Sequence, residues 1–332
     1  MIAETNWKQV KSTRYEVAVL PWGATEAHNW HLPYGTDTLQ NEALCAEAGH
    51  RAWQAGAKVA VLPCLPFGVQ TGQLDIPFCI NLNPSTQLAM LEDIIASLEG
   101  VGVPKFVLLN GHGGNDFRQM LRELQARHPG IFLSLVNWFS IPGAQEIFTI
   151  VGDHADERET SLMLHLHPDW VLPKEEWGPG TDNLWKIEAM RQKWAWAQRA
   201  WTQATNDTGS GDPQHSTADK GARYFDHLAG RFASYLVDLA QADPAALYQR
   251  HDGEGGLAPA RRAGSRVGHL PIPGALGQDA LPENPAPWGQ DALPGNPAPR
   301  GQGDLPGNPA PYLSTRPLFA SREKRFHLDF LS

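Results

Sequence analysis

Cysteine is scarce in this chain. Three occur in 332 residues, at Cys45, Cys64 and Cys79, and none of them forms a pair separated by two residues. An odd, widely spaced set excludes a small domain stabilised by a disulfide framework, and it equally excludes a zinc ribbon.

Positive charge and long apolar runs are also lacking. The chain has 27 Lys and Arg against 36 Asp and Glu, a formal net charge of −9. Nucleic acid and anionic membrane surfaces call for clustered basic residues, so neither is expected as a partner. No apolar run approaches the roughly 18 residues of a membrane-spanning helix. The N-terminus lacks the basic and apolar regions of a signal peptide. We therefore expect a cytoplasmic protein.

Proline, glycine and asparagine are abundant near the C-terminus. Three copies of a twelve-residue repeat follow one another at 277–288, 289–300 and 301–312. Each copy has a single Leu, so ordering the repeats would bury too little apolar area to offset its entropy cost. A solenoid is the weaker alternative, because solenoid repeats are normally longer and more apolar. The sequence predicts one domain over 1–248 and a disordered tail without chemistry over 249–332.

Apolar runs alternate with helical stretches in the first 248 residues. This alternation predicts an α/β fold with a mostly parallel sheet covered by helices on both faces. Ligands then bind at the carboxyl ends of the strands. Strands are expected at 15–23, 57–68, 104–115 and 131–139, and helices at 38–56, 83–102, 116–130 and 216–243.

Half of the twelve tryptophans lie between residues 170 and 201. We expect a helix over 182–205, with the rings packed against the domain or another subunit. The alternative is that some of these rings line a substrate pocket.

Residues 25–37 contain Glu26, His28, His31 and Asp37 in one loop. Carboxylate oxygens and imidazole nitrogens suit Zn²⁺, Mn²⁺ or Fe²⁺, so the loop is a candidate for half of a metal site. A hydrogen-bonded polar turn is the alternative.

Two further stretches carry candidate functional groups. At 108–116 an expected strand delivers His112 to a turn containing Gly113 and Gly114, whose N–H groups are available to an oxyanion. At 153–168, His154 and Glu159 lie near the start of an apolar helical stretch. The neighbouring Asp156 and Glu157 are interpreted as complements of the helix N-terminus.

Four segments together resemble a known family. "PWGATEAHNWHLPYGTD", "LLNGHGGN", "HADERETSLML" and "GSGDPQHSTADKG" occur in the order found in the creatininase family of metal-dependent amidohydrolases. The resemblance covers roughly residues 5–245. It implies a three-layer α/β/α fold, a homohexamer, and a site for two divalent ions, usually Zn²⁺, Mn²⁺ or Fe²⁺.

The resemblance also implies a ligand set. Glu26 and His112 would bind one metal, His28 the other, and Asp37 would bridge both. His31 would lie beside the site without binding a metal. Creatininase has an acidic metal ligand where this chain has Gly114, and we expect Glu159 to take over that role.

The expected substrate pocket departs from the family pattern. Ile150 stands where creatininase has one substrate-stacking Trp, while Trp138 is a plausible counterpart of the other. A family segment with a His and a Phe-Pro-Gly-Thr run is altered here, at Gln73, Phe78 and Cys79. Creatinine is therefore not the expected substrate.

These features predict a hydrolase acting on a C–N bond other than a peptide bond, in a cyclic amide, formamide or similar small polar molecule. A metal-activated water would attack, with His154 and Glu159 as catalytic groups and the Gly113 and Gly114 N–H groups as oxyanion donors. Two alternatives are hydrolytic C–C ring opening of a cyclic ketone or sugar-like substrate, and a non-catalytic oligomeric assembly protein.

Overall fold

The computed structural model describes residues 1–149 and 152–249. The predicted tail, from residue 250 on, lies outside these residues together with its repeats, and so does Ile150. Among the helices described, none has the length and apolar character needed to cross a membrane.

The described part of the chain contains a four-stranded parallel sheet. The strands are β1 (Val17–Trp22), β2 (Val59–Val61), β3 (Lys105–Asn110) and β4 (Phe132–Asn137), in the order β2-β1-β3-β4. The main helices are α1 (Trp7–Ser12), α2 (Thr36–Gln54), α3 (Pro84–Gly100), α4 (Arg118–Arg127), α5 (Glu157–Leu166) and α8 (Ala218–Gln241). The four expected strands and the helices expected at 38–56, 83–102, 116–130 and 216–243 are confirmed, with shifted ends.

β2 is much shorter than the strand predicted over 57–68. It ends at Val61, and the chain continues through Pro63 and Pro66. Because proline has no backbone N–H to donate to a neighbouring strand, the ladder is interrupted here, and it resumes only as an isolated bridge between Trp22 and Leu65.

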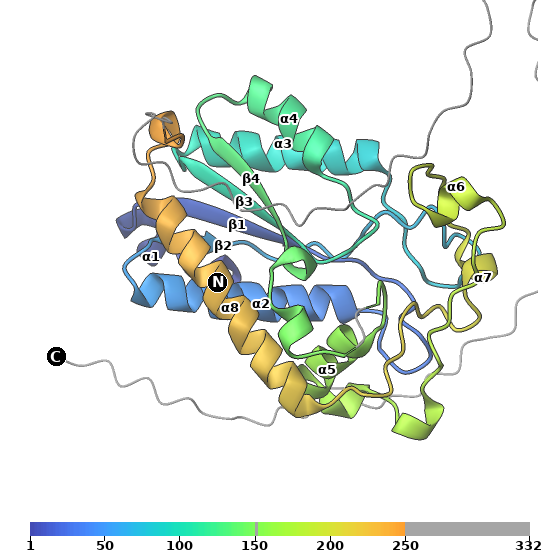
Figure 1. Cartoon of the computed structure of the whole chain (residues 1–332). Coiled ribbons are helices and arrows are strands. Elements are labelled where there is room, and N and C mark those ends of the chain that lie inside the picture. The colour runs from blue at the N-terminus through green and yellow to red at the C-terminus, as the bar shows by residue number, and fades with distance from the viewer. Residues whose placement is uncertain (150–151, 250–332) are drawn as a thin grey trace, which may run out of the picture. The chain divides into compact units, whose positions relative to one another are not determined.

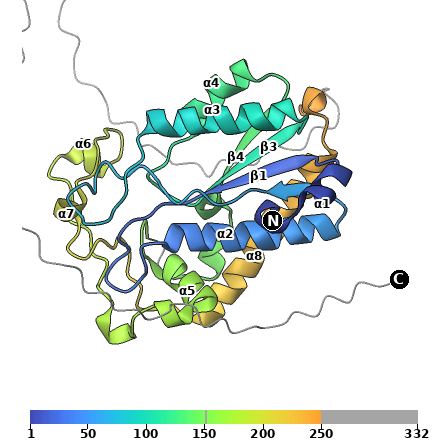
Figure 2. The same ribbon diagram turned by 180° about the vertical axis from the view of Figure 1, so that it is seen from behind.

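Helices cover both faces of the sheet. Val17 and Val19 of β1 belong to a core cluster that includes side chains of α2, α5 and α8. Ala18 and Leu20 point to the opposite face, into a second cluster with α3 and α4. Figure 1 shows α3 and α4 on one side of the strands and α2 and α8 on the other, and Figure 2 shows the same layers from behind. The predicted three-layer α/β/α architecture is confirmed.

The strand order places a topological switch point between the ends of β1 and β3. The chain leaves β1 toward β2 through α2, and it leaves β3 toward β4 on the other side through α4. At such a switch point the loops that follow the two strands diverge and leave room for a ligand. Asn41 of α2 ties the two strands together, since its amide donates to the carbonyls of Trp22 (3.0 Å) and Leu109 (2.9 Å).

The prediction of a long helix over 182–205 is wrong. Two short helices occur there, α6 (Glu188–Arg191) and α7 (Trp201–Ala204). The ends of the segment meet, because the Asn183 N–H donates to the Ala204 carbonyl at 2.7 Å. The segment is therefore a closed loop.

Tryptophan spacing explains why no long helix forms. The tryptophans at 185, 194, 196 and 201 do not repeat every three or four residues, so a helix would not gather them on one face. Trp194 and Trp196 are 74% and 83% exposed, which contradicts packing of these two rings against the domain.

Candidate metal centre

The loop after β1 supplies the first two candidate ligands. Glu26 and His28 are both fully buried, and Asp37 follows in the first turn of α2. The loop bends at Asn29, which has a φ of 55°. The Asn29 side chain binds both the N–H (2.9 Å) and the carbonyl (3.1 Å) of Gly178. The bend is thus anchored to a distant part of the chain.

His112 enters from the end of β3. Its Nε2 lies 3.1 Å from the Val69 carbonyl, which can only accept a hydrogen bond. In the neutral ring the proton is therefore assigned to Nε2, which leaves the lone pair of Nδ1 for a metal. Nδ1 faces Glu26 Oε1 at 2.8 Å and Asp37 Oδ2 at 3.0 Å.

His28 has the opposite orientation. Its Nδ1 lies 3.1 Å from the Glu26 carbonyl, so the proton is assigned to Nδ1. Its Nε2 then faces Asp37 Oδ1 at 3.0 Å, with Glu159 Oε2 at 4.0 Å. The two oxygens of Asp37 thus lie next to two different imidazoles, those of His28 and His112.

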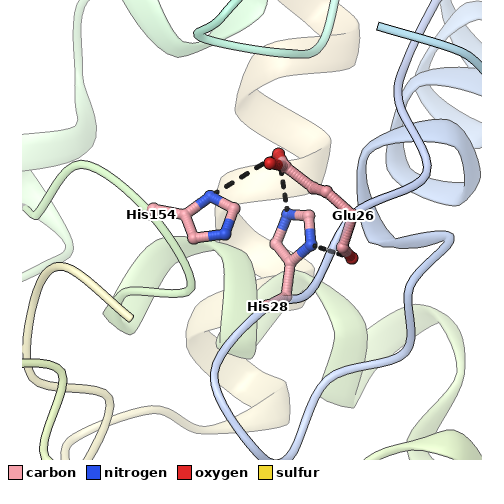
Figure 3. Close-up of side chains that lie close together, drawn as sticks. All are labelled: Glu26, His28 and His154. Atoms are coloured by element: carbon pink, nitrogen blue, oxygen red, sulfur yellow. Dashed lines mark hydrogen bonds and ion pairs between the residues drawn. The ribbon is translucent and has the colours of Figure 1, made fainter. Parts of the chain in front are cut away.

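The third stretch brings His154 and Glu159 to the same place. His154 Nε2 donates to the Ala27 carbonyl at 2.8 Å, and its Nδ1 lies 3.7 Å from Glu26 Oε1. Figure 3 shows that the imidazoles of His28 and His154 each direct one nitrogen toward the Glu26 carboxylate. Glu159 Oε2 accepts the Ala155 N–H at 2.6 Å.

Asp156 caps the helix that carries Glu159. Its side chain accepts the backbone N–H groups of Arg158 and Glu159, as expected for a helix N-terminus. This contact places the first turn of α5 beside the site.

The donor atoms form three groups, each able to hold a cation. The groups are Glu26, His28 and His154; Glu26, Asp37 and His112; and His28, Asp37 and Glu159. Glu26 Oε1 and Asp37 Oδ2 are buried and accept no hydrogen bond. Buried carboxylate oxygens without donors, facing imidazole nitrogens with free lone pairs, fit a divalent metal that accepts N and O ligands.

Electrostatics show how tightly charge is packed here. Burial by itself lowers the pKa of His28, but the carboxylates of Asp37 and Glu26 raise it to about 10. Burial raises the pKa of Glu159 to about 8, against the opposing charge of His28. Without a metal, the raised pKa of His28 favours a protonated ring that compensates the neighbouring carboxylates, and a divalent cation would displace that proton and take over the compensation.

His31 lies next to these groups and belongs to none of the three. Its Nε2 is 2.9 Å from Thr160 Oγ1, and its ring stacks on Trp177 with centroids 4.9 Å apart. Its role beside the site, without binding a metal, stays a prediction.

Trp138 does not reach the site as a stacking surface. Its side chain is 1% exposed and packs edge-on against Tyr224 and Phe139 in the core. Because the core covers this ring, the position does not support the predicted substrate contact. Gly113 and Gly114 are exposed on the turn beside His112, and their role as oxyanion donors stays a prediction.

Two contacts were missed by reasoning from sequence. The Gln73 amide donates to Glu26 Oε2, and the Trp201 ring packs against His154 with centroids 4.9 Å apart. Gln73 was noticed as an altered position without a role, and Trp201 was one of six clustered tryptophans. His154, expected as a proton carrier alone, also lies in a donor group.

Comparisons with known proteins agree on one family. A family model named Creatininase, described as creatinine amidohydrolase, matches residues 3–236. The creatinine amidohydrolase of Pseudomonas putida is 31% identical over 196 residues, 51% of this chain and 73% of that protein. The mycofactocin precursor peptide peptidase of Mycolicibacterium smegmatis is 28% identical over 225 residues, 66% and 84% of the two chains. A crystal structure of a Bacteroides fragilis protein described as a creatinine amidohydrolase is 40% identical, with a TM-score of 0.70 over 75% of this chain and 98% of that one.

Proposed function

The chain belongs to the creatininase family of metal-dependent hydrolases, and on this premise we propose that it is an amidohydrolase acting through two divalent metal ions. Its substrate would be a small polar molecule with a hydrolysable C–N bond, such as a cyclic amide or a formamide. The observation that carries this proposal is the convergence of three histidines and three carboxylates on one buried site, with two carboxylate oxygens lacking donors.

The geometry around Asp37 supports the assignment of the ligands. Each of its oxygens lies 3.0 Å from the free nitrogen of a different imidazole, one of His28 and one of His112. This placement supports the proposal that Asp37 would be the ligand shared by two ions. Glu26 would join His112 on one ion. Glu159 would join His28 on the other, in place of the acid that the family carries at the position of Gly114.

When bound, two such ions lower the pKa of a water molecule and polarise the carbonyl under attack. The chain's own residues would do the rest. His154 directs Nδ1 into the site while its Nε2–H is held by the Ala27 carbonyl, so Nδ1 is placed to carry a proton to the leaving nitrogen. The exposed N–H groups of Gly113 and Gly114 would donate to the developing oxyanion.

The names of two of the curated relatives bear on the substrate. One is a creatinine amidohydrolase and the other a peptide peptidase, and both names describe cleavage of an amide C–N bond. The restriction to non-peptide bonds stays a prediction. The burial of Trp138 supports a substrate other than creatinine, since one expected stacking surface is absent from the site. Iron as the metal, the homohexamer and the cytoplasmic location also stay predictions.

A substrate panel tests the proposal. We expect chelator-treated protein to be inactive, and Zn²⁺ or Mn²⁺ to restore hydrolysis of at least one cyclic amide, formamide or short peptide, measured as released amine, ammonia or formate. Metal-dependent turnover of a cyclic ketone without these products would favour C–C ring opening instead. A stable oligomer that neither binds metal nor turns over any substrate would identify an assembly protein.

Replacing Glu159 by glutamine is expected to remove one of the two ions. The glutamine still accepts the Ala155 N–H, so α5 keeps its place, but the side chain loses the negative charge that a metal ligand needs here. Elemental analysis of dialysed protein should give about one ion per chain in place of about two. An unchanged metal content would show that Glu159 is not the replacement ligand.

A further inference from the structure

A buried amide stands behind the Glu26 carboxylate. Gln73 is 1% exposed and lies in the loop between β2 and α3. Its Nε2 donates to Glu26 Oε2, while its Oε1 lies 3.2 Å from Cys79 Sγ. A carboxylate can only accept hydrogen bonds, so the amide nitrogen must face Glu26. The amide oxygen is then left to accept the thiol proton of Cys79.

Cys79 links the Gln73 amide to the backbone of the loop that carries Glu26 and His28, here called the ligand loop. The backbone N–H of Ala27 donates to Cys79 Sγ at 3.3 Å. Ala27 lies between Glu26 and His28 in the chain. The hydrogen bonds therefore run from the backbone of the ligand loop through the thiol and the amide, and return to the carboxylate of the same loop.

This path decides which oxygen of Glu26 is free. Oε2 is occupied by Gln73, whereas Oε1 accepts no hydrogen bond. Oε1 lies 2.8 Å from His112 Nδ1, 3.7 Å from His154 Nδ1 and 3.9 Å from His28 Nε2. The free oxygen is thus the one that faces all three imidazoles.

We propose that Gln73 is a positioning residue that holds Glu26 with one carboxylate oxygen directed at the metal site, and that Cys79 sets the orientation of its amide. The inference rests on the proposed function, because it requires Glu26 to bind metal. Hydrogen bonds from neighbouring groups to a metal ligand fix its orientation, and their loss typically weakens metal binding about 10–100-fold.

The tryptophan-rich loop secures the position of Gln73. The backbone N–H of Trp201 donates to the Gly72 carbonyl at 3.0 Å, and the Thr202 hydroxyl donates to the Asp75 carboxylate at 2.6 Å. These contacts hold the chain on both sides of Gln73. Residues 201–202 therefore act on the site through the loop that carries the amide, in addition to the contact of Trp201 with His154.

The test is the affinity of the full chain for Zn²⁺ alone, measured by competition with a chromophoric chelator. Gln73→Met keeps much of the side-chain shape and removes both hydrogen bonds, and we expect about 10–100-fold weaker binding. Cys79→Ala should weaken binding less, on the order of threefold, whereas Cys79→Ser keeps a donor and should remain near the wild-type value. The control is Gln125→Leu, which removes a glutamine that bonds His128, Ile131 and Leu133 far from the donor groups.

A spectroscopic measurement separates positioning from loss of folding. In Co²⁺-loaded protein the visible ligand-field bands should shift in Gln73→Met and stay unchanged in Gln125→Leu. Binding within twofold of wild type, with unshifted bands in Gln73→Met, would overturn the inference. If the wild-type chain binds no metal, the proposed function fails. If Glu26→Ala loses metal while Gln73→Met does not, the positioning role alone fails.

Discussion

Replacing Asp37 by alanine is expected to abolish both metal binding and hydrolysis. In the native chain we expect about two divalent ions, and in the variant fewer than one. Each oxygen of Asp37 faces a different histidine, so under the proposed assignment the substitution would remove a ligand from both metal positions at once. It would also remove the negative charge that the proposal places between two cations, whose repulsion would then be uncompensated. Elemental analysis after dialysis against metal-free buffer measures the effect.

Asp116→Ala is the matched control for this experiment. Asp116 follows the His112 turn, is exposed, and accepts the Arg118 N–H outside the donor groups. The control should keep the wild-type metal content. Full metal content and full activity in Asp37→Ala would refute the assignment of the ligands.

Replacing Gly114 by alanine is expected to disrupt the site almost as severely. A Cβ atom at this position would lie 2.4 Å from His112 Nε2 and 2.6 Å from the Val69 carbonyl oxygen. These two atoms form the hydrogen bond that orients His112, so the methyl group would intrude directly on that contact. We expect a loss of about 2 kcal/mol in the free energy of unfolding, the usual cost of overpacking, together with weaker metal binding. Chemical denaturation and the Zn²⁺ affinity measure the two effects.

Gly113→Ala separates this steric effect from a general need for glycine. A Cβ at Gly113 meets no atom within 4 Å, so this variant should keep its stability and its metal. Equal damage in both variants would show that the turn requires flexibility, and not space beside His112. Gly114→Glu, which introduces the acid that the family carries here, should fail to restore a ligand because the same Cβ clash comes first.

The candidate ligands differ in how far the sequence alone could predict that they meet. Glu26, His28 and Asp37 lie close together in the chain, and their position after a buried strand already predicts a site at the sheet edge. His112 follows the neighbouring strand of a parallel sheet, so its meeting with them follows from topology. For Glu159 the sequence showed only that an acidic ligand of creatininase is absent at Gly114 and that Glu159 is a candidate to replace it. Its position 4.0 Å from His28 depends on how α5 packs beside α2.

The errors have a common physical cause. The prediction for Trp138 rested on its resemblance to a substrate-stacking Trp of creatininase, and the prediction for 182–205 rested on local sequence pattern. Whether an aromatic ring faces a substrate, a core or solvent depends on which distant segments cover it. Tyr224 of α8 covers Trp138, whereas no such partner in the described chain buries Trp194 or Trp196.

By itself the sequence determined the layered α/β architecture, and it predicted the edge of the sheet and the core of the ligand set that we propose for metal binding. These follow from apolar periodicity and from residues that are neighbours in the chain. The tertiary structure decided what depends on distant contacts. His154 reaches the carbonyl of Ala27 across 127 positions, and Gln73 reaches Glu26 across 47. Such contacts carry no local pattern, because they arise only when the packing of whole helices and loops brings those side chains together.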